Sequence, residues 1–327
     1  MNKYAKRALI ASTVVIGAAV GVLLAGSHYY VNMAIKRNTK KYSNNKRREK
    51  SLNKKDPEML RHMFLVHEDM VKKSESWLQE VKKEEVSIIS NDNLKLYGEL
   101  YSNSGSHRYV IIVHGYNCTL DDMYCYGPVF YEKGYNVLFI DMRAHGKSEG
   151  DYIGMGWLER FDLQKWCNFI VQRDPDAEIL LYGQSMGAAC VLMTSGEALP
   201  DNVKAIVEDS GYASVGEMYK TIMKEALHLP AFPFLNTANA DAKRRAGYSF
   251  FDADAGKQVQ KSKLPIMFIH AEGDSYVPFS NVHTLYDLAP GPKEIYTVPE
   301  AEHVCAAFYD KDTYFEKLFN FTDRYIK

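Results

Sequence analysis

Six short apolar segments recur between residue 109 and residue 298, and a stretch long enough for a helix separates most of them. Continuous apolar runs of this length are typical of strands that are buried on both faces. Strands of this kind alternate with helices in a largely parallel sheet that helices cover on both sides. The pattern therefore predicts an α/β fold. The expected strands are Tyr109–His114, Tyr135–Asp141, Glu178–Gly183, Val203–Asp209, Pro265–His270 and Lys293–Val298.

A helix is expected to lead into this domain. Asp56 can cap it, Pro57 suits the first helical position, and Glu58 complements the positive end of the helix dipole. We assign residues 56–84 to this linking helix and residues 85–327 to the α/β domain.

Two segments depart from the alternation of strands and helices. Val86–Ser90 and Leu94–Tyr101 alternate apolar and polar residues, and the turn-forming sequence Asn91-Asp92-Asn93 joins them. They are expected to form an antiparallel hairpin. No strand pattern is evident across about residues 212–262, which we assign to a small helical cap inserted in the domain.

The amino-terminal region contains an uncharged stretch of 19 residues, Ala8–Gly26, preceded by Lys3, Lys6 and Arg7. As a helix it would be roughly 28 Å long, enough to cross the hydrocarbon core of a bilayer. A cleaved signal peptide is the alternative, but its apolar region is normally shorter. We therefore expect residues 1–35 to form a transmembrane anchor that contacts the lipid bilayer through residues 8–26. The protein is then a single-pass membrane protein, with its α/β domain outside the cytoplasm.

Charge is unevenly distributed along the chain. Residues 36–55 are rich in lysine and arginine and are expected to form a solvated basic linker, with contact to anionic lipid headgroups as the alternative. The whole chain has a formal net charge of −1, so no overall positive field would recruit nucleic acid.

The motif Gly183-Gln184-Ser185-Met186-Gly187 follows the predicted strand at Glu178–Gly183 and precedes a helix of small residues. A serine at such a turn is held in a strained, exposed conformation, and the flanking glycines let neighbouring backbones approach closely. Ser185 is therefore the expected nucleophile. A serine hydroxyl needs a base to remove its proton and an acid to orient that base.

The base and the acid are expected to follow the nucleophile in the chain. His303 follows the last predicted strand and is the expected base, whereas Asp274 follows the preceding strand and is the expected acid. Asp209 and Glu272 are alternatives for the acid. For Asp209 we favour a hydrogen bond that fixes a loop near the nucleophile.

The tetrahedral intermediate of acyl transfer needs two preorganised N–H donors. Met186, directly after the nucleophile, and Tyr116, after the first parallel strand, are expected to supply them from their backbones. His114 precedes the nucleophile and is expected to order this loop through hydrogen bonds. The segment Asp141–Ser148 lacks the spacing of a phosphate-binding loop and is expected to brace the site.

No cofactor or metal is implied, since the histidines show no ligand spacing for zinc and no HExxH sequence occurs.

Together, the segments Val113–Tyr116, Asp141–Ser148 and Gly183–Gly187, with Asp274 and His303, resemble the α/β hydrolase superfamily. Within it, the chain is similar to microbial serine-aminopeptidase-like hydrolases, a group that includes monoacylglycerol lipases and cinnamoyl or feruloyl esterases. The resemblance implies the catalytic roles given above. These relatives usually have glycine where this chain has Ala271, a difference that leaves Asp274 in place.

The expected function is that of a serine hydrolase that cleaves small or medium carboxylic esters through an acyl-enzyme. Peptidase or amidase activity with the same residues is the close alternative. A catalytically inactive binding protein is a third possibility, which the complete set of three residues in order disfavours.

Overall fold

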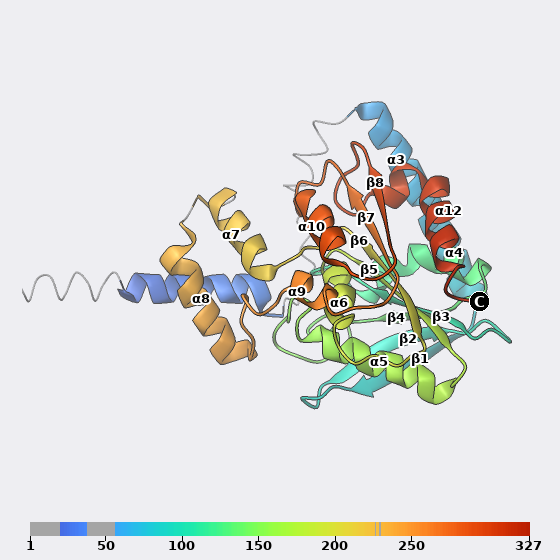
Figure 1. Cartoon of the computed structure of the whole chain (residues 1–327), viewed down its shortest axis with the longest axis horizontal. Helices are drawn as coiled ribbons and strands as arrows, with labels where there is room; N and C mark the ends of the chain where they lie inside the picture. Colours follow the sequence, from blue (N-terminus) through green and yellow to red (C-terminus); the bar gives the residue numbers. More distant parts are fainter. Residues whose placement is uncertain (1–19, 38–55, 226, 229) are drawn as a thin grey trace, which may run out of the picture.

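An eight-stranded sheet forms the centre of the computed structural model, which describes residues 20–37, 56–225, 227–228 and 230–327 (Figure 1). The strand order is β1-β2-β4-β3-β5-β6-β7-β8. Neighbours are antiparallel from β1 to β4 and parallel from β4 to β8. The strands are β1 (Lys83–Ile89), β2 (Lys95–Tyr101), β3 (Arg108–Val113), β4 (Asn136–Ile140), β5 (Glu178–Gln184), β6 (Val203–Asp209), β7 (Ile266–Ala271) and β8 (Lys293–Val298). The predicted α/β fold is confirmed, because the expected hairpin and all six parallel strands are present.

Helices cover both faces of the sheet (Figure 1). Along β3, Val110 and Ile112 join one cluster of buried apolar side chains, while Ile111 and Val113 join another, as the alternation of a strand requires. The helices on the first face are α3 (Pro57–Glu80), η1 (Leu120–Tyr126), α4 (Gly127–Glu132), α11 (Ala306–Tyr309) and α12 (Lys311–Thr322). Those on the second face are α5 (Glu159–Arg173), α6 (Met186–Thr194), α9 (Ala255–Val259) and α10 (Ser280–Leu288).

Helix α3 begins as its sequence indicates. The carboxylate of Asp56 accepts the backbone N–H of Glu58 at 3.1 Å, and Pro57 is the first helical residue. Met70 and Trp77 on one side of α3 are buried in the cluster of the first face. The Trp77 ring lies 4.5 Å from that of Tyr101 at the end of β2. Helix α3 therefore packs on the sheet as part of the α/β domain.

Three helices project together from one end of the molecule: α7 (Val215–Glu225), α8 (Ala231–Ala246) and the helix at residues 20–35 (Figure 1). The ring of Tyr30 makes edge-to-face contacts with Tyr219 of α7 at 5.7 Å and Phe234 of α8 at 5.8 Å. Helix α9, within the interval assigned to the cap, packs on α6 instead.

The predicted single-pass membrane localisation is contradicted. Within the described residues, no helix combines the length and apolar character that a bilayer span requires. Residues 8–19 of the expected span lie outside the described residues, and residues 20–26 belong to the helix that packs on the cap. The orientation expected for the α/β domain rested on that span and is not retained. Bilayer contact through residues 8–19 lies outside the described residues. The helix that carries residues 20–26 continues to residue 35, and a stripe of buried residues beyond the expected span holds it against protein: Ser27, Tyr30, Val31, Ala34 and Ile35. Within the expected span, Val20, Val22 and Leu24 are exposed.

The expected basic linker also differs from the structure in its first two residues. Lys36 pairs with Tyr152 in an isolated antiparallel bridge, and the backbone N–H of Arg37 donates to the carbonyl of Asp151 at 2.7 Å. The remainder, residues 38–55, lies outside the described residues.

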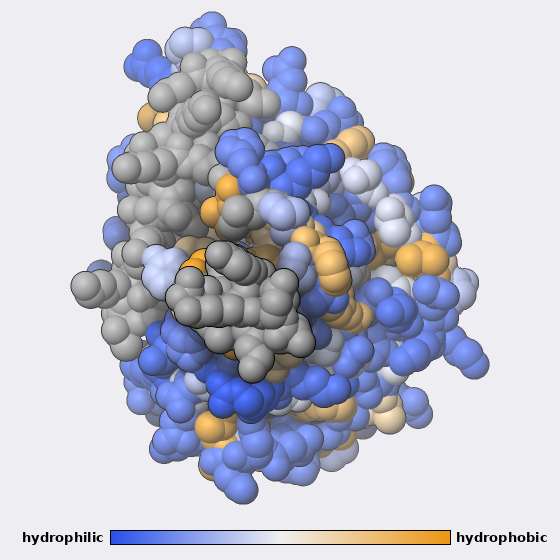
Figure 2. All heavy atoms as spheres, turned by 90° about the vertical axis from the view of Figure 1, so that its left-hand side faces the viewer, coloured by the Kyte–Doolittle hydropathy of each residue, from blue (hydrophilic) through white to orange (hydrophobic). Residues whose placement is uncertain are grey.

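The projecting end has a mixed surface. Figure 2 views the molecule from this end and shows small apolar areas within a mainly hydrophilic surface. Val22, Leu24 and Tyr29 are among the exposed large apolar side chains of the helix at residues 20–35, and Phe232 is exposed on α8. Tyr29 and Tyr30 are thus adjacent residues with opposite environments.

This difference provides a test of how the amino-terminal helix docks. We expect Tyr30→Ala to loosen the helix, because truncating a buried aromatic side chain typically costs about 3–5 kcal/mol. Hydrogen exchange should quicken in residues 20–35 and in α7 and α8. The matched control is Tyr29→Ala, which removes a ring that is 72% exposed and should leave exchange unchanged. Equal effects of the two substitutions would contradict the docking.

Candidate active site

Ser185 lies at a sharp turn between β5 and α6. Its backbone has φ 54° and ψ −115°, a conformation that non-glycine residues rarely adopt. A Cβ atom at Gly183 would lie 2.3 Å from the carbonyl oxygen of Gly187, and one at Gly187 would lie 2.2 Å from that of Val113. Both positions therefore require glycine. The N–H of Ser185 donates to the carbonyl of Asp209 at 2.8 Å, which fixes the turn to the end of β6.

His303 lies beside Ser185, although 118 residues separate them in the chain. It is carried by the loop after β8, and its Nε2 is 2.8 Å from the Ser185 Oγ. The ring of Tyr276 stacks on the imidazole with 5.4 Å between centroids. The histidine is thus held against the serine from one side.

The carboxylate of Asp274, in the loop after β7, holds the other side of the imidazole. Its Oδ2 is 2.6 Å from His303 Nδ1, and its Oδ1 accepts the backbone N–H groups of Tyr276 and Val277, each at 2.8 Å. Burial opposes ionisation, but the charge of His303 and hydrogen bonds from His270 and His303 outweigh it and hold the pKa of Asp274 below its usual range. A buried, ionised carboxylate therefore faces the imidazole.

The two alternative acids are engaged elsewhere. The carboxylate of Asp209 accepts the hydroxyls of Ser210 at 2.9 Å and Tyr314 at 3.0 Å. Glu272 is exposed and accepts the hydroxyl of Thr297 at 2.8 Å. The described contacts therefore bring Asp274, and neither alternative, to hydrogen-bonding distance of His303.

The sequence interpretation missed His270 as a neighbour of the acid. Its side chain is fully buried, and its Nε2 lies 3.1 Å from the carbonyl of Val277 and 3.4 Å from Asp274 Oδ2. The spacing of four residues between His270 and Asp274 was the available signal. Only the turn after β7 folds the two side chains together.

The two expected N–H donors belong to segments that lie next to the serine. Met186 is the first residue of α6, where backbone N–H groups have no partner within the helix. Gly115 lies so close to Ser185 that a Cβ atom on it would be 3.4 Å from the serine Cβ, which places the backbone of the Tyr116 loop at the nucleophile. The Tyr116 hydroxyl donates to the carbonyl of Ala34 at 2.8 Å.

Two neutral histidines support this loop. Burial lowers the pKa of His114 to about 4, and burial together with the electrostatic cost of protonating two adjacent imidazoles lowers the pKa of His145 to about 3. His114 Nδ1–H donates to the carbonyl of Gly115 at 2.8 Å, and its Nε2 accepts the N–H of Met142 at 3.1 Å. His145 Nε2 accepts the N–H of Asn117 at 3.3 Å. His114 thus orders the loop as expected, and His145 extends the same support from the segment Asp141–Ser148.

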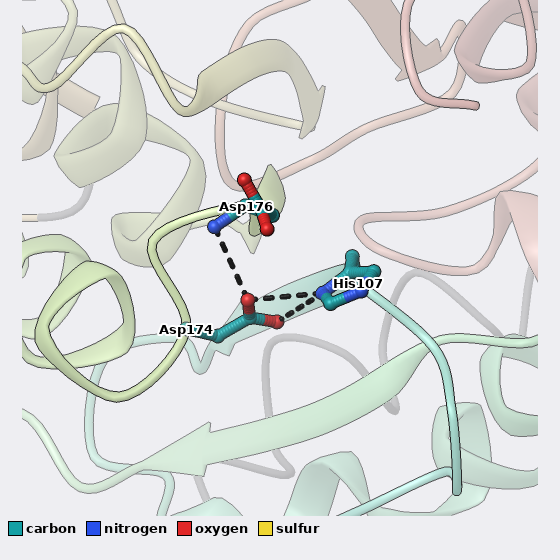
Figure 3. Close-up of side chains that lie close together, drawn as sticks. All are labelled: His107, Asp174 and Asp176. Carbon is teal, nitrogen blue, oxygen red and sulfur yellow. Dashed lines mark hydrogen bonds and ion pairs between the residues drawn. The ribbon is translucent and has the colours of Figure 1, made fainter.

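One group of potential metal ligands occurs among the described residues, and it lies away from Ser185. His107 faces Asp174 with its Nδ1 2.8 and 2.9 Å from the two carboxylate oxygens, while the backbone N–H of Asp176 donates to the same carboxylate at 3.2 Å (Figure 3). These residues precede β3 and β5, whereas Ser185 follows β5. The group is therefore at the opposite edge of the sheet and reads as an ion pair with a supporting turn.

The arrangement at Ser185 has a defined chemical capacity. The imidazole can accept the proton of the serine hydroxyl, and the ionised carboxylate orients the ring and stabilises its charged form. Backbone N–H groups beside the serine can bind an oxyanion.

The profile described as "Serine aminopeptidase, S33" matches residues 105–238, which include Ser185 and end before Asp274. The uncharacterized protein YqkD of Bacillus subtilis is 29% identical over 65% of this chain and 70% of its own length. Lysophosphatidylserine lipase ABHD12 of Danio rerio is 27% identical over 60% of this chain and 52% of its own length.

A solved structure with the same fold is that of the esterase Pf2001 of Pyrococcus furiosus. It superposes with a TM-score of 0.62 at 25% identity, over 76% of this chain and 94% of the esterase. The sheet order, the turn at Ser185, the matching profile and these relatives agree, and the chain belongs to the α/β hydrolase superfamily.

Proposed function

We propose that this protein is a serine hydrolase that cleaves carboxylic esters, with Ser185 as nucleophile, His303 as general base and acid, and Asp274 as the orienting carboxylate. One observation carries the proposal. The imidazole of His303 is hydrogen-bonded on one side to the serine hydroxyl at 2.8 Å and on the other to a buried carboxylate at 2.6 Å. Such a chain is the arrangement that activates a serine.

Acylation follows from this geometry. Ser185 Oγ attacks the ester carbonyl carbon while its proton passes to His303 Nε2, and the resulting oxyanion accepts the N–H groups of Tyr116 and Met186. The bond from carbon to the alcohol oxygen then breaks, and the alcohol leaves with the proton from His303. In deacylation a water molecule repeats the sequence, releasing the carboxylic acid and restoring the serine hydroxyl.

Several observations support an ester with an apolar acyl group. The esterase Pf2001 and lysophosphatidylserine lipase ABHD12, which the chain resembles, act on esters by their names. The cap contributes aromatic side chains, and the ring centroids of Tyr219 and Phe250 lie 4.7 Å apart. The Tyr219 ring also contacts Tyr30, which lies one helical turn before Ala34, the residue whose carbonyl accepts the Tyr116 hydroxyl. All three rings are buried, whereas Phe232 of α8 is exposed.

A peptidase is the competing function, because the family model that matches residues 105–238 is described as a serine aminopeptidase. The two functions use the same residues and differ in the leaving group. A profile across p-nitrophenyl esters, monoacylglycerols and aminoacyl-anilides separates them. We expect the esters to be turned over faster, and faster turnover of the anilides would reverse the assignment.

The nucleophile can be tested directly with a fluorophosphonate probe. The full chain should form a covalent adduct, and Ser185→Ala should form none. Ser280→Ala is the matched control, because Ser280 is an exposed serine at the start of α10. Labelling that persists in Ser185→Ala would overturn the proposed nucleophile.

The assignment of the acid makes a second prediction. Asp274→Asn should lower kcat by about 10⁴-fold, because the amide cannot hold the imidazole in its productive tautomer. Glu272→Gln alters an exposed carboxylate and should leave kcat and KM unchanged. Initial rates on p-nitrophenyl butyrate, normalised to folded protein by circular dichroism, provide the measurement. A small effect of Asp274→Asn would remove this residue from the mechanism.

A further inference from the structure

The last turn of the helix at residues 20–35 ends against the loop that follows β3. The final carbonyl groups of a helix have no partner within it. Here the Tyr116 hydroxyl donates to the carbonyl of Ala34 at 2.8 Å, and the N–H of Ile153 donates to that of Ile35 at 2.7 Å. Both partners come from the α/β domain. The end of the amino-terminal helix is thus capped by Tyr116, the residue proposed to donate its backbone N–H to the oxyanion.

Arg37, two residues beyond this helix, binds a second loop. Its Nη1 donates to the carbonyl of Ser148 at 2.6 Å and to that of Gly150 at 3.4 Å, and its Nη2 donates to that of Gly146 at 2.8 Å. A guanidinium suits this task because its donors form a planar fork with a fixed charge. One side chain therefore gathers three backbone carbonyls of the segment that follows β4.

That segment in turn holds the Tyr116 loop. His145 Nε2 accepts the N–H of Asn117 at 3.3 Å. The carboxylate of Asp141 joins the two loops further, since it accepts the N–H of Leu120 at 2.9 Å and that of Lys147 at 2.7 Å. Residues 34–37 therefore reach the Tyr116 loop by two routes, one through the tyrosine hydroxyl and one through Arg37.

We propose that Arg37 is a positioning residue of the active site, which holds the backbone N–H of Tyr116 toward the oxyanion by fixing the loop at residues 146–150. This inference rests on the proposed hydrolase function. It assigns a supporting role to the carbonyl of Ala34 and the side chain of Arg37, and it explains why a cation from the basic segment is seated among backbone carbonyls. Arg37 does not touch the reacting atoms and acts through the loops it joins.

Its effect should fall on the transition state. Removing an oxyanion donor outright costs about 10²–10³ in kcat, and misplacing one costs less. We therefore expect Arg37→Met to lower kcat about 10- to 100-fold while KM changes little. Arg37→Lys keeps the charge without the fork and should fall between wild type and Arg37→Met. Tyr116→Phe cuts the direct route and should act in the same direction.

The test uses the full chain and active-site titration, so that kcat refers to competent enzyme. Lys36→Met is the matched control, because it removes the adjacent, exposed cation and should behave as wild type. A trifluoromethyl ketone, whose serine adduct carries the oxyanion, should lose affinity in Arg37→Met in proportion to kcat/KM. If Arg37 had only a structural role, Arg37→Met would reduce the titrated active fraction or the Tm, and would leave the ketone affinity and the kcat/KM per titrated site unchanged.

The outcomes separate the two proposals. Wild-type kcat per titrated site in both Arg37→Met and Arg37→Lys overturns the role of Arg37. Parallel losses in kcat and ketone affinity, absent from Lys36→Met, support it. Ser185→Ala is assayed alongside: if it keeps activity, the proposed function fails whatever Arg37 does. If it is inactive while the Arg37 variants match wild type, the inference about Arg37 fails alone.

Discussion

The close approach of three backbones at Ser185 is the constraint on which the active site depends. β5 turns into α6 with the serine at φ 54°, and Gly187 passes so near the carbonyl of Val113 in β3 that no side chain fits. Such a conformation costs on the order of 1–3 kcal/mol and persists only where the surroundings over-determine it. The hydrogen bond from the serine N–H to Asp209 and the packing of α6 on β5 provide that support. The serine is presented at the carboxyl edge of the sheet as a result.

Much of this arrangement could be predicted because its signals are local. The parallel strands are continuous apolar runs, and the glycines around Ser185 occur where backbone contact demands them. Asp274 and His303 follow successive strands, and the carboxyl ends of parallel strands meet at one edge. The sheet therefore converts a simple order along the chain into the observed contacts. The choice among Asp274, Asp209 and Glu272 needed the three-dimensional contacts, since all three residues follow or end a strand near that edge.

The amino-terminal region was misjudged for a physical reason. An uncharged run up to Gly26 suggested a bilayer span, whereas the same helix continues to Ile35 and is held against protein by a buried stripe that begins at Ser27. Apolarity alone does not say whether lipid or protein will cover a helix. The partners of Arg37 are backbone carbonyls, which leave no trace in the side-chain sequence. Contacts between a side chain and backbone carbonyls therefore cannot be predicted from the sequence alone.

The packing of the three projecting helices has a consequence for the order in which the chain folds. Ser27 and His28 bind partners in α8 that lie more than 200 residues later, and Ser185 meets His303 only across 118 residues. Contacts this distant in sequence form late, because closing the intervening loop costs entropy before any contact repays it. During synthesis the helix at residues 20–35 emerges before α8 and must wait for it before its stripe can be buried. Until then its apolar residues stay exposed, so the nascent chain needs protection from aggregation at this segment.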